Sequence, residues 1–241
     1  KLISTKMNYL ILIRHGQSTW NLEKRFTGWV DVDLTKNGKS EAKKAGQLIK
    51  NEKINIDLYY TSFQLRAKNT LKIIQNELKD NKDVKNAWEL NERHYGALTG
   101  LSKDKMKIKL GEDKIYQFRR SWDLKPDPLD KKNPYHPLNI ETYKEISKDK
   151  IPDTESLKDT YERVIKFYKD EIENKNNKNI LISAHGNSLR ALCKYLFNLD
   201  NNEISKLEIP TGNPLLIKLE NNKISNCKYL DNERAKDLLV F

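Results

Sequence analysis

Two apolar segments of strand length, far apart in the chain, are followed by the same dipeptide, and this repetition constrains the fold more than any other feature. Residues 9–13 lead into Arg-His-Gly and residues 180–184 into His-Gly, which places His15 and His185 directly after two strands. Short, continuous apolar runs are typical of parallel strands buried on both faces. Because the carboxyl ends of parallel strands lie along one edge of a sheet, the pattern predicts that the two histidines meet there. A single such histidine would more often be an ordinary loop residue, but the matched pair favours a functional site.

The segments between these strands alternate between helix and strand patterns. Residues 40–49, 71–78 and 189–196 carry apolar side chains at helical spacing, and residues 56–61 read as a further strand. This alternation predicts an α/β fold with three layers, α/β/α, around a mostly parallel central sheet.

A region from about residue 100 to residue 152 interrupts the alternation. Four of its prolines are crowded together among charged residues, namely Pro126, Pro128, Pro134 and Pro137. Such a segment predicts a helical or irregular insertion beside the core. We therefore expect one domain over residues 7–241 that contains this insertion. Met7 has the character of a natural start, so residues 1–6 are expected to be an upstream or cloning remnant.

Composition narrows the class of protein. The chain has 45 Lys and Arg against 34 Asp and Glu, but the excess is mostly lysine scattered along the sequence, without a nucleic-acid reader motif. No apolar run approaches the roughly 20 residues that cross a bilayer, and no signal-type stretch is present. The two cysteines, Cys193 and Cys227, form no CxxC motif. We expect a cytoplasmic protein with small anionic ligands and no nucleic-acid or membrane partner.

Two histidines beside arginines suit phosphoryl transfer. The neutral imidazole of His15 is a good nucleophile toward phosphorus. A phosphoryl group in transfer spreads negative charge over three oxygens, and the forked guanidinium groups of Arg14 and Arg66 match that charge. His185, if protonated, adds another donor. The sequence contains no metal-binding motif of the zinc or calcium type, so we expect no metal.

A proton donor is also needed for a leaving group on oxygen. Glu92 lies in the dense polar stretch 91–96 and is the candidate acid–base residue. An exposed turn glutamate explains the local sequence about equally well.

Several longer segments resemble a known family. They are Leu-Ile-Arg-His-Gly-Gln-Ser-Thr-Trp-Asn (12–21), Arg-Phe-Thr-Gly-Trp (25–29), Asp-Val-Asp-Leu (31–34), Leu-Asn-Glu-Arg-His-Tyr-Gly-Ala-Leu-Thr-Gly (90–100), Arg-Arg (119–120), Ala-His-Gly-Asn-Ser-Leu-Arg (184–190) and Ile-Pro-Thr-Gly (209–212). Together they resemble the cofactor-dependent phosphoglycerate mutases of the histidine phosphatase superfamily, from about Met7 to Leu230. Arg-His-Gly is shared across the superfamily, whereas Asn-Glu-Arg-His-Tyr-Gly with Phe-Thr-Gly-Trp is specific to the mutases.

The resemblance implies interconversion of 3-phosphoglycerate and 2-phosphoglycerate in glycolysis and gluconeogenesis. It implies that His15 becomes phosphorylated by 2,3-bisphosphoglycerate, that Glu92 is the acid–base, and that Arg14, Arg66 and His185 hold the phosphoryl group. The implied ligand-contacting residues are Ser18, Asn21, Thr27, Gly28, Arg93, Tyr95, Lys103, Arg119, Arg120, Gly186 and Asn187. The resemblance also implies a homo-oligomer, with a dimer expected, and no metal.

The chain departs from the family pattern in two places. Gln17 stands where the family usually has glutamate, and the segment after Arg234 is shorter than in many relatives. A short tail leaves open how well water is excluded from the phosphorylated site. A phosphatase of the same superfamily is therefore the alternative interpretation.

Overall fold

A six-stranded sheet forms the middle layer of the computed structural model, which describes residues 6–175 and 177–238. The strands are β1 (Met7–Arg14), β2 (Leu58–Thr61), β3 (Val84–Asn86), β4 (Ile180–Ala184), β5 (Leu215–Glu220) and β6 (Lys223–Tyr229). Their order is β3-β2-β4-β1-β5-β6, in which β3, β2, β4 and β1 are parallel and β5 and β6 are antiparallel additions. The predicted mostly parallel sheet is confirmed. Of the predicted N-terminal remnant, residues 1–5 lie outside the described residues.

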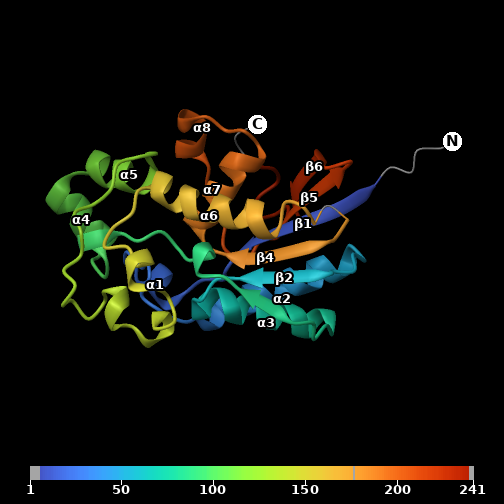
Figure 1. Cartoon of the computed structure of the whole chain (residues 1–241), viewed down its shortest axis with the longest axis horizontal. Coiled ribbons are helices and arrows are strands. Elements are labelled where there is room, and N and C mark those ends of the chain that lie inside the picture. Colours follow the sequence, from blue (N-terminus) through green and yellow to red (C-terminus); the bar gives the residue numbers. More distant parts are fainter. Residues whose placement is uncertain (1–5, 176, 239–241) are drawn as a thin grey trace.

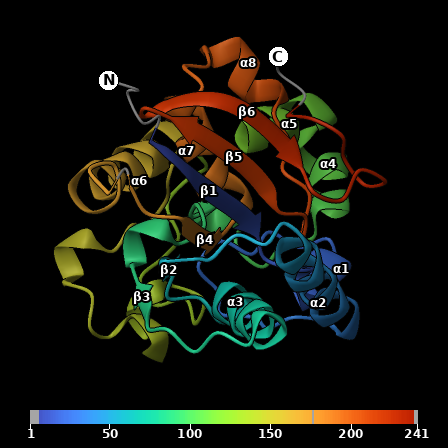
Figure 2. The same ribbon diagram turned by 90° about the vertical axis from the view of Figure 1, so that its right-hand side faces the viewer.

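Helices cover both faces of this sheet. The pair α2 (Lys36–Asn51) and α3 (Leu65–Leu78) lies on one face, and the pair α6 (Leu157–Glu171) and α7 (Gly186–Leu196) lies on the other, as Figures 1 and 2 show. The predicted three layers are therefore confirmed. α2 begins earlier than the apolar spacing indicates, because the Thr35 side chain caps it by accepting a hydrogen bond from the Gly38 N–H.

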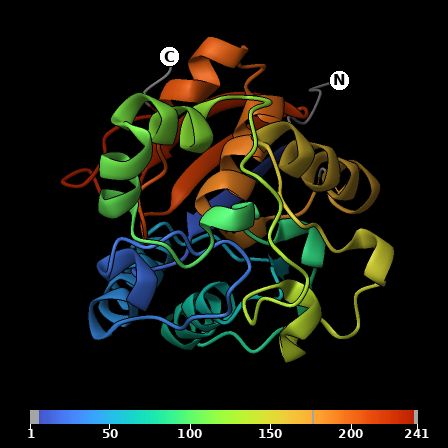
Figure 3. The same cartoon turned by 90° about the vertical axis from the view of Figure 1, so that its left-hand side faces the viewer.

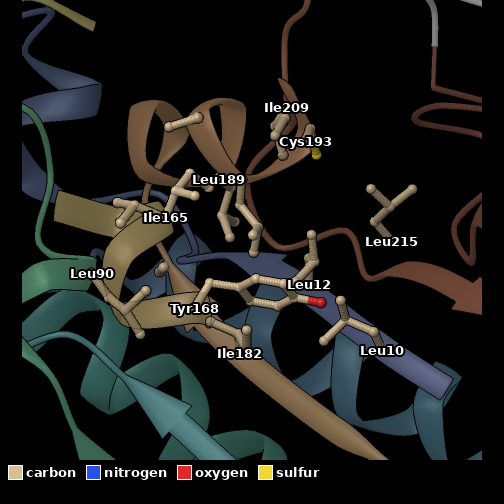
Figure 4. Close-up of a cluster of buried hydrophobic side chains, with 14 of the residues drawn as sticks. Leu10, Leu12, Leu90, Ile165, Tyr168, Ile182, Leu189, Cys193, Ile209 and Leu215 are labelled. Atoms are coloured by element: carbon tan, nitrogen blue, oxygen red, sulfur yellow. The ribbon is translucent and has the colours of Figure 1, made fainter. Parts of the chain in front are cut away.

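The apolar runs of the sequence are explained by burial on both faces. In β1, Leu10 and Leu12 pack against the α6–α7 side, where Figure 4 shows them beside Tyr168. Ile11 and Ile13 belong to the cluster on the α2–α3 side. Successive side chains of a strand point to opposite faces, so a strand between two helical layers needs apolar residues at every position.

The insertion is partly helical. It holds the helices α4 (Lys103–Leu110) and α5 (Glu112–Arg120). Outside it lie the helices α1 (Thr19–Leu22) and α8 (Asn201–Lys206) and the short 3₁₀ turns Trp88–Leu90 and Gly96–Leu98. In Figure 1, the carboxyl ends of the parallel strands point toward the side that α4 and α5 occupy, and Figure 3 views this side directly. Phe26 and Tyr95 from the core region pack with Ile115 and Phe118 of α5.

The domain boundaries stay a prediction. No helix within the described ranges is long and apolar enough to span a membrane.

Two glycines bring the loop after β1 against the first turn of α2. A Cβ on Gly38 would lie 2.0 Å from Gln17 O, and a Cβ on Gly16 would lie 2.2 Å from Gly38 O. Neither glycine has a positive φ, so close packing rather than backbone conformation requires them. This contact fixes the loop that carries His15.

We expect Gly38→Ala to destabilise the protein although alanine is the better helix former. The gain of up to about 1 kcal/mol in helix propensity is outweighed by a clash that costs about 1–3 kcal/mol. Urea denaturation checks this, with Lys39→Ala, an exposed change on the same turn, as the matched control. An unchanged or higher midpoint for Gly38→Ala would show that the loop moves away at no cost.

Candidate active site

The carboxyl edge of the sheet brings the two predicted histidines together. β1 and β4 are neighbours, with Arg14 paired to Ala184, and the His15 N–H donates to Ala184 O at 3.0 Å. The ring centroids of His15 and His185 lie 5.0 Å apart. The two residues are 2% and 0% exposed, so water has little access to either ring.

The orientation of the His15 ring suits a nucleophile. Its Nδ1 lies 2.7 Å from Gly16 O. Because a carbonyl only accepts, Nδ1 carries the proton and Nε2 keeps a free lone pair. Burial, and then the charges of Arg66 and Arg14, lower the pKa of His15 well below its ordinary value. The imidazole is therefore neutral near pH 7.

His185 is also neutral in this environment. Burial, followed by the charges of Arg66 and His15, lowers the pKa of His185 well below its ordinary value. Its Nε2 lies 2.7 Å from Ser62 Oγ, and its Nδ1 has no hydrogen-bond partner in the part of the chain that the structure describes. His185 was predicted to act as a donor if it is protonated. In the ligand-free protein its ring is neutral, so this condition is not met.

The arginines of the site are held by backbone carbonyl oxygens. These bonds run from Arg14 Nη1 to Ile209 O (2.8 Å), from Arg66 Nη2 to Gly28 O (2.8 Å) and from Arg66 Nη1 to Val30 O (2.9 Å). A carbonyl satisfies a guanidinium N–H without cancelling its charge. Arg14 also has a buried Nε with no partner among the described residues, and it packs beside Gly186. The site thus offers uncancelled positive charge to an anion.

A polar cleft adjoins the two histidines, and most of the predicted ligand contacts line it. Its lining residues are Arg14, Asn21, Thr27, Gly28, Glu92, Tyr95, Lys103, Arg119, Arg120, Gly186, Asn187, Arg190, Glu208 and Ile209. Lys103 begins α4, and Arg119 and Arg120 end α5. Burial, Arg119 and Arg14 lower the pKa of Lys103 to about 8. The insertion therefore supplies a second group of cations, opposite the strand ends.

Glu92 lies in this cleft at 8% exposure. Its Oε1 accepts hydrogen bonds from the backbone N–H groups of Arg93 (2.8 Å) and Asn187 (3.1 Å). Oε2 has no partner within the described ranges. One oxygen fixes the carboxyl group, and the acid–base role of Glu92 stays a prediction.

Besides the two histidines, three predicted residues lie outside the cleft lining. Ser18 is fully buried and caps α1, where its Oγ accepts from the Asn21 N–H. Arg93 is buried and donates to Glu155 O and Leu124 O. Arg66 is 1% exposed, and its charge acts on both histidines. The roles given to them stay predictions.

Sequence reasoning missed Arg190, which lines the cleft and joins it to α8. Arg190 Nη1 donates to Asn187 Oδ1 at 2.9 Å, and Nε donates to Leu207 O at 3.0 Å. It also missed the buried ion pair of Arg163 with Glu155, in which Nε lies 2.8 Å from Oε2. Arg163 also donates to Glu92 O at 2.9 Å, so the pair positions the segment that carries Glu92. The bonds from Arg190 to Leu207 O and from Arg163 to Glu92 O span 17 and 71 residues, so they leave no local signal in the sequence.

No group of three or more His, Cys, Asp or Glu side chains suited to a metal ion occurs among residues 6–175 and 177–238. A metal-free reaction stays a prediction.

Comparisons with known proteins identify related chains. The family model of the histidine phosphatase superfamily (branch 1) matches residues 10–136 and 130–231. A Pelagibacter ubique (strain HTCC1062) protein named 2,3-bisphosphoglycerate-dependent phosphoglycerate mutase is 71% identical over 238 residues, which cover 98% of this chain and 100% of that protein. A Borreliella burgdorferi (strain ZS7) protein with the same name is 48% identical over 217 residues, covering 89% and 88%. The solved structure of a mycobacterial glucosyl-3-phosphoglycerate phosphatase has a TM-score of 0.65 at 19% identity, covering 88% and 90%, and shares the fold.

We expect His15 and His185 to stay neutral at pH 6. An ordinary histidine, with a pKa of about 6.5, would be mostly protonated at that pH, but the pKa values of these two are lowered well below it. The measurement is an NMR titration of the ring proton and carbon shifts between pH 8 and 5. The urea-unfolded chain is the control, in which the histidines should titrate near 6.5. A midpoint at or above 6.5 for His15 in the folded protein would contradict the argument.

Proposed function

The chain belongs to the 2,3-bisphosphoglycerate-dependent phosphoglycerate mutases of the histidine phosphatase superfamily, which interconvert 3-phosphoglycerate and 2-phosphoglycerate in glycolysis, and we propose that it does so through a phosphorylated His15. The observation that carries the proposal is the pair of buried histidines, 5.0 Å apart, beside a cleft with cations on two sides. One group of cations stabilises the charge of the phosphoryl group in transfer. The other group binds the remaining phosphate or carboxylate of the substrate.

His15 is the nucleophile in this proposal. Its Nε2 attacks phosphorus, an N–P bond forms, and the bond from phosphorus to the donor oxygen breaks with its electron pair on that oxygen. The hydrogen bond from Nδ1–H to Gly16 O holds the ring in this orientation throughout. 2,3-Bisphosphoglycerate, when bound, supplies the phosphoryl group that primes His15.

Glu92 moves the proton. When the hydroxyl of a monophosphoglycerate attacks phospho-His15, Glu92 accepts the hydroxyl proton, and it returns a proton when a phosphoryl group goes back to His15. The two N–H donors on Oε1 keep the carboxyl group in place during both steps. Arg14, Arg66 and His185 stabilise the charge on the phosphoryl oxygens.

The cleft fits a ligand with two anionic ends. The Nε of Arg14 and the Nδ1 of His185 are buried polar atoms without a partner among the described residues, and a phosphoryl group would satisfy them. Lys103, Arg119 and Arg120 would hold the other phosphate or the carboxylate of a phosphoglycerate. We also propose a cytoplasmic, metal-independent enzyme that forms a homo-oligomer, with a dimer expected.

We expect the protein to convert 3-phosphoglycerate into 2-phosphoglycerate in excess chelator, and the rate to rise when a trace of 2,3-bisphosphoglycerate is added. Phosphorus NMR follows both phosphoglycerates and inorganic phosphate directly, without a magnesium-dependent coupling enzyme. His15→Ala should lose turnover and should not become labelled by the phosphoryl donor.

Different outcomes of this experiment separate the alternatives. Inorganic phosphate in place of 2-phosphoglycerate would identify a phosphatase that uses the same histidine. Labelling of the His15→Ala variant would overturn the assignment of the nucleophile.

We expect kcat/KM for 3-phosphoglycerate to fall above pH 8, because a pKa of about 8 makes Lys103 neutral at higher pH and removes a charge that binds substrate. The loss should approach tenfold for each pH unit beyond that point, if only the charged form binds. The measurement is the pH profile of kcat/KM between pH 7 and 9.5. Lys103→Arg keeps its charge in this range and should flatten the profile. An equal fall in that variant would assign the titration to another group.

A further inference from the structure

Ser62 contacts the candidate site although neither the sequence motifs nor the proposed mechanism uses it. It follows β2 directly, and β2 lies beside β4, with Thr61 paired to Ser183. Its side chain is fully buried. Its Oγ lies 2.7 Å from His185 Nε2 and accepts a hydrogen bond from the Gln64 N–H at 3.1 Å. Ser62 therefore sits at the same sheet edge as the two histidines.

Two arrangements of protons are compatible with the 2.7 Å contact. If His185 Nε2 carries the proton, Ser62 Oγ accepts two hydrogen bonds, and its own hydrogen has no acceptor among the described residues. The lone pair on His185 Nδ1 is then unpaired too. If Ser62 instead donates to Nε2, the hydroxyl is satisfied as donor and acceptor, and the one unpaired group is Nδ1–H. A buried polar group without a partner is costly, so the second arrangement is favoured.

The second arrangement also suits an anionic ligand. A neutral imidazole has only one N–H, so the nitrogen that carries it decides whether the other ring edge presents a donor or a lone pair. Burial and the neighbouring Arg66 keep the His185 ring neutral in the free protein. A lone pair on Nδ1 would repel phosphoryl oxygens, whereas Nδ1–H would donate to them.

We propose that Ser62 is a positioning residue that donates its hydroxyl hydrogen to His185 Nε2 and thereby keeps the proton on Nδ1, where it serves the phosphoryl group held beside His15. The role of Nδ1–H toward the phosphoryl group rests on the proposed function. The position of the proton on the His185 ring is a property of the ligand-free protein and does not depend on that function.

The tautomer of His185 tests the inference directly. In protein labelled with nitrogen-15, long-range correlation spectra distinguish the protonated ring nitrogen from the unprotonated one, and Nδ1 from Nε2 by their couplings to the ring protons. The chain has four histidines, and the signals absent from a His185→Asn sample assign the ring. We expect Nδ1–H in the ligand-free wild-type protein at pH 7. Nε2–H as the main form would overturn the proposal without the need for any variant.

Two serine variants separate positioning from packing. Ser62→Ala should shift His185 toward Nε2–H or a mixture of tautomers, and lower kcat by about 10- to 100-fold, with a smaller change in KM. Ser183→Ala is the matched control, because Ser183 is also fully buried and its Oγ donates to Ala67 O at 2.9 Å. That variant should leave the tautomer and kcat near the wild-type values. Thermal unfolding of both variants shows whether each is folded at the assay temperature.

The remaining outcomes are decisive as well. An unchanged Nδ1–H tautomer in folded Ser62→Ala would show that another group fixes the ring, and would overturn the role of Ser62. Equal losses of kcat in the two serine variants would attribute the effect to packing. If the wild-type protein shows Nδ1–H and Ser62→Ala loses it, but neither interconverts phosphoglycerates, the proposed function fails while the tautomer assignment stands.

Discussion

The candidate site depends on buried guanidinium groups whose hydrogen bonds go to backbone carbonyl oxygens. The carbonyls satisfy the donors, which removes the cost of burying unpaired polar groups, but they bring no negative charge that would cancel the arginine. Arg66 and Arg190, at 1% and 3% exposure, are held in this way. Burial first, and then the positive charge concentrated here, lower the pKa values of His15 and Lys103.

A second set of buried charges is paired, and it holds a backbone segment in place. Arg163 and Glu155 form a buried two-pronged ion pair, and the pair also binds the backbone on both sides of Arg93, through Glu92 O and the His94 N–H. The cancelled charges fix the segment that carries the candidate acid–base residue. Arg14 and Arg190, which are held by carbonyl oxygens, lie against the cleft, whereas Arg120 there is paired with Glu208 at 3.3 Å. The cleft therefore holds both unpaired and paired cations.

Several elements were predicted from their local signatures, but α6, β5 and β6 were not. β1 and β4 were evident because burial on both faces requires unbroken apolar runs, and α3 and α7 were evident from their spacing. The three-residue β3 was missed because it is too short to show a period. In the site, the rule that polar residues after parallel strands converge located the two histidines. The same rule applied to β2 would have found Ser62.

Long-range contacts explain the rest of what local reasoning missed. Arg190 contacts carbonyl oxygens of α5 and α8, and nothing near it in sequence reveals those partners. Lys103 and the pair Arg119–Arg120 were found only through family resemblance, because a cation on an insertion helix looks like an ordinary basic surface. Electrostatic roles depend on which charges lie near one another, which the fold decides.

The carbonyl-held arginines have a thermodynamic consequence for the whole molecule. In the absence of an anion, the folded state confines several like charges that the unfolded chain would disperse in water, and this repulsion opposes folding. An anion that fills the cleft relieves it and binds only the folded state, so its free concentration adds a term RT ln(1 + [L]/Kd) to the free energy of unfolding. The resistance of such a protein to unfolding is therefore tied to the metabolite pool around it, and is lowest when phosphorylated metabolites are scarce.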